Sequence, residues 1–227
     1  MNVIISLIFF TGLITISHAE ERLISVQGRI SDFRGNPISE AVVHFEDKNF
    51  KPLYTAYTDV NGHFSVEVAN RSYTIFAVKD HGVKYLEYWH WNYIPRNNRY
   101  LEIKIDGIEL YGMKVWSTEP AHKSLILYIR PMSLKRWIAA GRPRDINPDT
   151  PSIAPIINRE SIVAKLNGES IKVLGINSVK EYVGDKGTLD AFLISLEPKA
   201  IPSSGSTLCL TLNDLSISEY GMGCIDL

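Results

Sequence analysis

The chain has no excess of charge of either sign. Its 227 residues carry 24 basic and 25 acidic side chains, so no broad electropositive surface for nucleic acid or an anionic membrane is expected. Common catalytic motifs are missing too: there is no His-Glu-x-x-His, Gly-x-Ser-x-Gly, Gly-x-x-x-x-Gly-Lys or Cys-x-x-Cys. The histidines show no spacing typical of metal ligands. We therefore expect no cofactor, no bound metal and no nucleic-acid partner.

Cysteine is scarce, with only Cys209 and Cys224 in the chain. An even number in an exported protein suggests one disulfide. Such a bond would join the last strand to its neighbour across a predicted final hairpin. A loop of that size contributes about 3 kcal/mol to stability in the chain-entropy model. Two buried thiols are the alternative.

Charged side chains are absent from residues 1–19. An almost unbroken apolar run from Val3 to Ile16 is followed by Ser17-His18-Ala19, a pattern typical of a cleaved signal peptide. The run is shorter than the roughly 20 residues that a bilayer span needs. We expect a signal peptide over 1–19 and a secreted or periplasmic protein with no stable membrane span after cleavage. An uncleaved anchor is the alternative, because no Lys or Arg precedes the run.

Short stretches of alternating apolar and polar residues, separated by turn signals, fill the rest of the chain and predict an all-β protein. Asn61-Gly62 and Asn167-Gly168 are strong hairpin signals, and the second lies between the predicted strands 161–166 and 169–174. One short helix is expected over 133–140, where Ser133 can cap the N-terminus and Gly141 follows the C-terminus.

Four motifs of the first half occur in an order that can be compared with a known module. They are Val26-x-Gly28-Arg-Ile-Ser-Asp32-x-x-Gly35-x-Pro37-Ile38, Ala41-Val-Val, Thr58-Asp59-x-Asn61-Gly62-x-Phe64 and Tyr73-Thr-Ile. Over about residues 23–93 the chain thereby resembles the carboxypeptidase regulatory-like domain. The resemblance implies a seven-stranded sandwich of the transthyretin (prealbumin) or starch-binding-like kind, and a non-catalytic accessory module.

A break at Pro95-Arg-Asn-Asn98 predicts the domain boundary. Residues 20–98 would form the regulatory-like β-sandwich. Residues 99–227, with further short strands at regular spacing, would form a second antiparallel sandwich, immunoglobulin-like in the loose sense. The expected fold is therefore two antiparallel β-sandwich domains in tandem.

An aromatic segment at the end of the first half supplies the candidate binding residues: Tyr85, Tyr88, Trp89, Trp91 and Tyr93. In a regular strand Tyr88 points away from the other four. Such rings stack on sugars and anchor protein interfaces. The favoured alternative is burial, because both strand faces are apolar and a second domain begins nearby. It predicts that at least one of Trp89 and Trp91 is buried at the domain junction.

Together these features predict an exported, non-catalytic binding or interaction protein of the cell envelope or exterior. The expected partner is carbohydrate or another envelope protein. Two alternatives are open: an exported enzyme with a loop-built site that includes Arg144, Asp145 and Asp149, and a structural spacer of a surface assembly.

Overall fold

The protein is all-β apart from one short α-helix and one 3-10 turn in the computed structural model, which describes residues 22–118, 124–143, 150–183, 187–200 and 202–227. The predicted signal peptide over 1–19 and the loop residues Arg144, Asp145 and Asp149 lie outside the described residues. No helix in the described ranges is long and apolar enough to cross a membrane.

The elements follow one another along the chain as β1 (Leu23–Ser31), β2 (Val42–Glu46), β3 (Pro52–Tyr57), β4 (His63–Ala69), β5 (Tyr73–Val78), β6 (Tyr88–Tyr93), β7 (Tyr100–Lys104), β8 (Ile108–Thr118), β9 (Ser124–Ser133), α1 (Leu134–Ala139), η1 (Arg159–Ser161), β10 (Ile162–Leu166), β11 (Glu169–Tyr182), β12 (Thr188–Glu197), β13 (Thr207–Asp214) and β14 (Glu219–Asp226).

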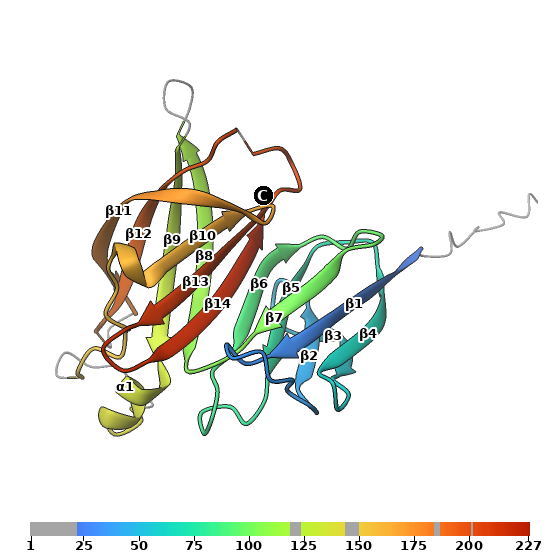
Figure 1. The fold of residues 1–227 in the computed structure, drawn as a ribbon, viewed down its shortest axis with the longest axis horizontal. Helices are drawn as coiled ribbons and strands as arrows, with labels where there is room; N and C mark the ends of the chain where they lie inside the picture. Colours follow the sequence, from blue (N-terminus) through green and yellow to red (C-terminus); the bar gives the residue numbers. More distant parts are fainter. Residues whose placement is uncertain (1–21, 119–123, 144–149, 184–186, 201) are drawn as a thin grey trace, which may run out of the picture.

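The first seven strands form a two-layered sandwich, on the right in Figure 1. One layer has the order β4-β1-β7, and the other has the order β6-β5-β2-β3. Apolar side chains from both layers share one core, among them Val26 and Ile30 of β1, Phe45 of β2 and Ile75 of β5. Strands β1 to β6 lie within residues 23–93, the range of the sequence resemblance, and β7 lies beyond it.

The second half is a closed barrel, and the predicted second sandwich is wrong in this respect. Its strands follow the order β13-β10-β11-β12-β9-β8-β14, and β13 also pairs with β14. Leu127, Ile194 and Leu210 are completely buried inside it. Because β14 pairs with both β13 and β8, neither end of the sheet is left as a free edge. The periodicity of the sequence predicts the strands, but it does not reveal this closure.

Strand β14 also joins the barrel to the sandwich, at the centre of Figure 1. It runs parallel to β6, with Gly223 opposite Trp89, and at Gly221 it pairs with Ile108 of β8. A Cβ atom at Gly221 would collide with the backbone of Ile108, so glycine permits the close approach of the two strands. The result is one continuous sheet of 11 strands that runs from the barrel into the sandwich.

Strand β7 belongs with the sandwich, although the predicted boundary at 98/99 places it in the second half. It pairs in parallel with β1, with Leu101 opposite Gly28, and its Leu101 and Ile103 enter the sandwich core. A parallel partner about seventy residues earlier leaves no local signal, because parallel strands are not joined by a short turn.

The turn at Asn61-Gly62 is present but does not form a hairpin. Strand β3 before it pairs with β2, and β4 after it pairs with β1 in the other layer. The Asp59 carboxylate accepts hydrogen bonds from the amides of Asn61 and His63, and the Gly62 carbonyl accepts one from Ile30. The turn is thus tied to β1 and carries the chain from one layer to the other.

Two other local predictions are confirmed. The Ser133 hydroxyl accepts a hydrogen bond from the Arg136 amide at the start of α1, 3.2 Å away. Strands β10 and β11 form a hairpin around Asn167 and Gly168, which have φ values of 51° and 85°. Positive φ at both central residues is the geometry that Asn-Gly favours in a two-residue hairpin.

The predicted disulfide between Cys209 and Cys224 is present and joins directly opposed residues of β13 and β14. We expect its loss to lower the free energy of unfolding by about 3 kcal/mol, because the bond closes a loop of 15 residues in the unfolded chain. Urea unfolding of wild type and of a Cys209→Ser/Cys224→Ser variant measures the difference. Dithiothreitol should destabilise only the wild type, and equal stability of the two proteins would contradict the prediction.

Candidate functional site

The five aromatic residues singled out from the sequence lie on opposite faces of the sheet around β6. Tyr85, Tyr88 and Tyr93 are buried in the sandwich core. Trp89 and Trp91 lie on the other face, toward the barrel. Simple alternation fails because the strand begins only at Tyr88, and because Asn92 has a φ of 53°, which changes the direction of Tyr93 relative to Trp91.

The two tryptophans belong to a group of rings at the junction of sandwich and barrel, the ring cluster: Phe50, Phe76, Trp89, Trp91 and Tyr111. Trp89 and Trp91 stack with ring centroids 5.4 Å apart. Tyr111 of β8 meets them edge-on at 5.4 and 5.3 Å, and Phe76 of β5 lies 5.1 Å from Trp89. Trp89 is 8% exposed, which confirms that at least one of the two tryptophans is buried at the junction.

Phe50, in the loop between β2 and β3, covers the two tryptophans from the solvent side. Its ring centroid is 6.0 Å from that of Trp89 and 6.1 Å from that of Trp91, yet the residue is 44% exposed. Its φ of 59° lies in the left-handed region, which costs a bulky residue about 1–2 kcal/mol. The Asp47 carboxylate holds the loop by accepting hydrogen bonds from the amides of Asn49 and Lys51. Nothing in the sequence around Phe50 indicates this role.

Strand pairing extends the ring cluster into a band across the continuous sheet. His44, Phe76 and Trp89 are successive partners on β2, β5 and β6. On the barrel side, Tyr111 is the partner of Arg130 on β9, whose guanidinium lies 4.5 Å from the centre of the Tyr111 ring. Such cation–π contacts contribute about 0.5–1 kcal/mol at exposed sites. The band therefore consists of the ring cluster together with His44 at one end and Arg130 at the other. It combines rings from both units with polar groups at its two ends.

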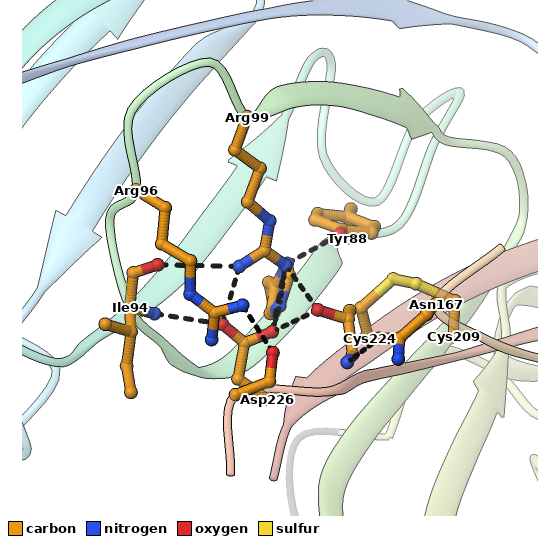
Figure 2. A network of polar contacts seen from close by, with 11 residues as sticks. Tyr88, Ile94, Arg96, Arg99, Asn167, Cys209, Cys224 and Asp226 are labelled. Atoms are coloured by element: carbon orange, nitrogen blue, oxygen red, sulfur yellow. Dashed lines mark hydrogen bonds and ion pairs between the residues drawn. A yellow bond between two sulfur atoms is a disulfide. The ribbon is translucent and has the colours of Figure 1, made fainter. Parts of the chain in front are cut away.

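The opposite face of β6 carries a buried polar network centred on Asp226 of β14, shown in Figure 2. Its carboxylate accepts hydrogen bonds from His90 Nε2 at 2.9 Å, from the Ile94 amide at 3.0 Å and from Thr207 Oγ1 at 2.8 Å. Arg99 forms a bidentate ion pair with it, at 2.7 and 2.9 Å. The network thus connects β6, the segment before β7, β13 and β14.

The protonation states in this network follow from burial and hydrogen bonding. Burial lowers the pKa of His90, so the ring is neutral and Nε2–H donates to Asp226, while the Tyr88 hydroxyl donates to Nδ1 at 3.2 Å. Burial raises the pKa of Tyr88 and keeps that donor protonated. Burial alone would raise the pKa of Asp226, but the hydrogen bonds from His90 and Arg99 outweigh it and hold the pKa well below its usual range.

The chemistry of the Asp226 network is that of a structural clamp. Each carboxylate oxygen already has partners, and both ring nitrogens of His90 are engaged, so no group in it is positioned to take a proton from a substrate. No local pattern predicts that these residues meet, because His90 and Asp226 are 136 positions apart. Across the part of the chain that the structure describes, no group of three or more side chains could hold a metal ion.

No family model matches the chain, and no curated protein matches it. Among solved structures, a DUF3823 family protein from Bacteroides ovatus ATCC 8483 matches with a TM-score of 0.29 at 10% identity over 91% of this chain and 100% of that one. BcpA, the major pilin subunit of Bacillus cereus, matches with a TM-score of 0.30 at 12% identity over 90% of this chain and 68% of that one. A DUF3823 family protein from Parabacteroides merdae ATCC 43184 matches with a TM-score of 0.28 at 8% identity over 91% and 100%. At this distance no functional argument rests on them, and the regulatory-like assignment stays a prediction.

Proposed function

We propose that the protein is an exported, non-catalytic binding protein of the cell envelope or exterior, and that carbohydrate is its ligand. The partly exposed residues of the band, above all Phe50 and Trp91, form the contact surface. The first unit is proposed to be a carboxypeptidase regulatory-like module, extended by β7 beyond residue 98. Another envelope protein is the alternative partner.

The observation that carries this proposal is the conformation of Phe50. A large apolar side chain is held in a left-handed backbone conformation and remains 44% exposed, where Gly would be less strained. Strain of this kind is found at ligand-binding positions, where the surrounding structure holds it in place. A residue that served only to join the two units would be expected to bury more of its ring, as Trp89 does.

The other aromatic candidates take a supporting part in this proposal. Tyr85, Tyr88 and Tyr93 fix β6 from the sandwich core, and Trp89 fixes it from the junction. Rigid support of this kind keeps the orientation of Phe50 and Trp91 constant, which lowers the entropy cost of binding. In a structural spacer, by contrast, Phe50 would be replaceable without loss of any interaction.

A Phe50→Gly variant separates the two roles. We expect its signal on a glycan array to fall at least about 10-fold. An aromatic side chain that a bound ligand covers contributes about 1–3 kcal/mol or more to binding. We expect its free energy of unfolding to change by less than about 1 kcal/mol, because release of the left-handed strain offsets the lost ring contacts. Tyr100→Ala, at a 47% exposed aromatic on β7 in the other layer of the sandwich, is the matched control and should bind as wild type does.

Each other outcome of this experiment identifies a different error. Equal array signals for wild type and Phe50→Gly would show that the band is not the contact surface. A wild-type protein that binds no glycan would exclude carbohydrate as the ligand and leave the envelope-protein alternative. A large loss of stability in Phe50→Gly would assign Phe50 to the junction rather than to binding.

A further inference from the structure

A cavity of about 230 Å³ lies beside the band, on the outer wall of the barrel. Side chains of β8, β9, β11 and β12 line it, together with residues 150–154. The residues that line it include Glu109, Arg130, Met132, Ser152, Lys180 and Asp190. The volume is below the roughly 300–1,000 Å³ of most small-molecule sites. It therefore suits one small unit of a ligand rather than an extended molecule.

The cavity and the ring cluster share a boundary. Arg130 lines the cavity, and its guanidinium also stacks on Tyr111. Glu109 lies two residues before Tyr111 on β8 and on the same face of the strand, because the residue between them, Leu110, is buried in the barrel. A ligand that touches the exposed rings can therefore place a neighbouring unit against Glu109 and Arg130.

Glu109 forms a carboxyl pair with Glu87. Burial, and secondly the neighbouring Glu87 carboxyl, raises the pKa of Glu109 well above its ordinary value, so Glu109 is protonated. One oxygen of Glu87 lies 2.8 Å from His81 Nε2, and the other is buried without a hydrogen-bond partner among the described residues. The indole N–H of Trp89 lies beside Glu109, and no described residue accepts a hydrogen bond of ordinary geometry from it. Glu109 thus offers hydrogen-bonding capacity without a negative charge.

The charged groups of the cavity wall are already neutralised within the protein. Arg130 is paired with Glu181 at 3.1 Å, and Lys180 with Asp190 at 2.6 Å. The Ser152 hydroxyl donates a hydrogen bond to Asp190 at 2.5 Å. No lining cation among the described residues is left to attract an anionic ligand. The wall therefore favours hydroxyl groups over carboxylate or phosphate groups.

We propose that this cavity is a subsite for one uncharged sugar unit, whose hydroxyl groups hydrogen-bond to Glu109 and Arg130 while the ligand's adjoining part lies on the rings of Phe50 and Trp91. This inference rests on the proposed carbohydrate binding and specifies its chemical class as neutral saccharide. It assigns discrimination between sugars to the barrel wall, and affinity for apolar sugar faces to the ring cluster.

The test is a calorimetric or NMR titration of the full chain with the methyl glycosides of glucose, galactose and mannose, and with glucuronic acid. We expect at least one neutral glycoside to bind and glucuronic acid to bind at least about 10-fold more weakly. Glu109→Leu should weaken that binding about 10-fold, the effect of leaving sugar hydroxyls unpaired. Glu109→Gln, an uncharged donor and acceptor of the same size, should bind within about threefold of wild type.

A second variant, Met132→Trp, fills the cavity beside Glu109, keeps both carboxyl groups of the pair, and should abolish binding even if Glu109→Leu proves unstable. Glu67→Leu, at an exposed position of β4, is the control. No binding of any of the three neutral glycosides, preference for glucuronic acid, or wild-type binding by Met132→Trp would overturn the subsite. The Phe50→Gly comparison on the glycan array is independent of these titrations, so the subsite can fail while the proposed function stands.

Discussion

Replacement of Asp226 by Asn is expected to lower the free energy of unfolding by about 3–5 kcal/mol, because it removes one member of a buried ion pair and leaves Arg99 without its counter-charge. The Asn side chain also presents an NH₂ group to a site whose neighbours are all donors, namely His90 Nε2–H, the Thr207 hydroxyl and the Ile94 amide. Urea unfolding followed by tryptophan fluorescence measures the loss.

The control for this variant is Asp80→Asn, at an exposed aspartate whose φ of 48° Asn adopts without difficulty. It should change stability by less than about 0.5 kcal/mol. A loss below about 1 kcal/mol for Asp226→Asn would show that the network is replaceable and is not the clamp between the two units.

The same network predicts how stability depends on pH. The pKa of Asp226 is lower in the folded protein than in the unfolded chain, so its contribution is complete above about pH 3.9 and is lost as the pH falls through the folded value. Burial lowers the pKa of His90, and this also makes the fold weaker as the pH drops below about 6.5. Stability should therefore fall on acidification. Below about pH 3.9 it should fall less steeply in Asp226→Asn, and equal slopes of the two proteins in that range would contradict this account.

Truncation of Trp89 to Ala is expected to lower the free energy of unfolding by about 3–5 kcal/mol, the usual cost of removing a buried large aromatic side chain. Its ring contacts Phe76, Trp91, Tyr111 and Phe50, so the change empties the centre of the ring cluster. Each aromatic pair adds about 0.5–1.5 kcal/mol to the burial of its area. Thermal and urea unfolding both measure the effect.

Trp116→Ala provides the matched control, because this tryptophan is 50% exposed on β8. It should cost about 1 kcal/mol or less. If Trp89→Ala retained wild-type stability but lost glycan binding, Trp89 itself would be a contact residue. If it unfolded while Phe50→Gly remained folded and lost binding, the division into a supporting Trp89 and a contacting Phe50 would be confirmed.

Local features of the fold were predictable from the sequence because their causes are local. Asn167 and Gly168 supply the two positive φ values of the hairpin between β10 and β11, and Ser133 caps α1 with its own hydroxyl. The disulfide between Cys209 and Cys224 follows from two cysteines on either side of one turn. The burial of at least one of Trp89 and Trp91 was predictable as well, since both faces of their strand are apolar.

The features that define the candidate site depend on contacts between distant segments and were not predictable. No turn connects β6 directly to β14, so no local pattern predicts their parallel pairing. This pairing brings His90 to Asp226, which lies 136 positions later in the chain. The direction of the Tyr93 side chain depends on the left-handed backbone conformation of Asn92. The alternation of apolar and polar residues does not predict this conformation. Phe50 joins the ring cluster from a loop whose amino-acid sequence indicates only a turn.

The pairing of β14 with β6 and β8 has a consequence for the order in which the protein folds. During synthesis β6 and β8 emerge long before β14, so one edge of the sandwich layer and one edge of the nascent barrel stay unpaired until residues 219–226 are available. Closure of such large loops slows folding, because their entropy cost precedes any gain from contacts. While these two edges are exposed, pairing with another chain can compete with native folding.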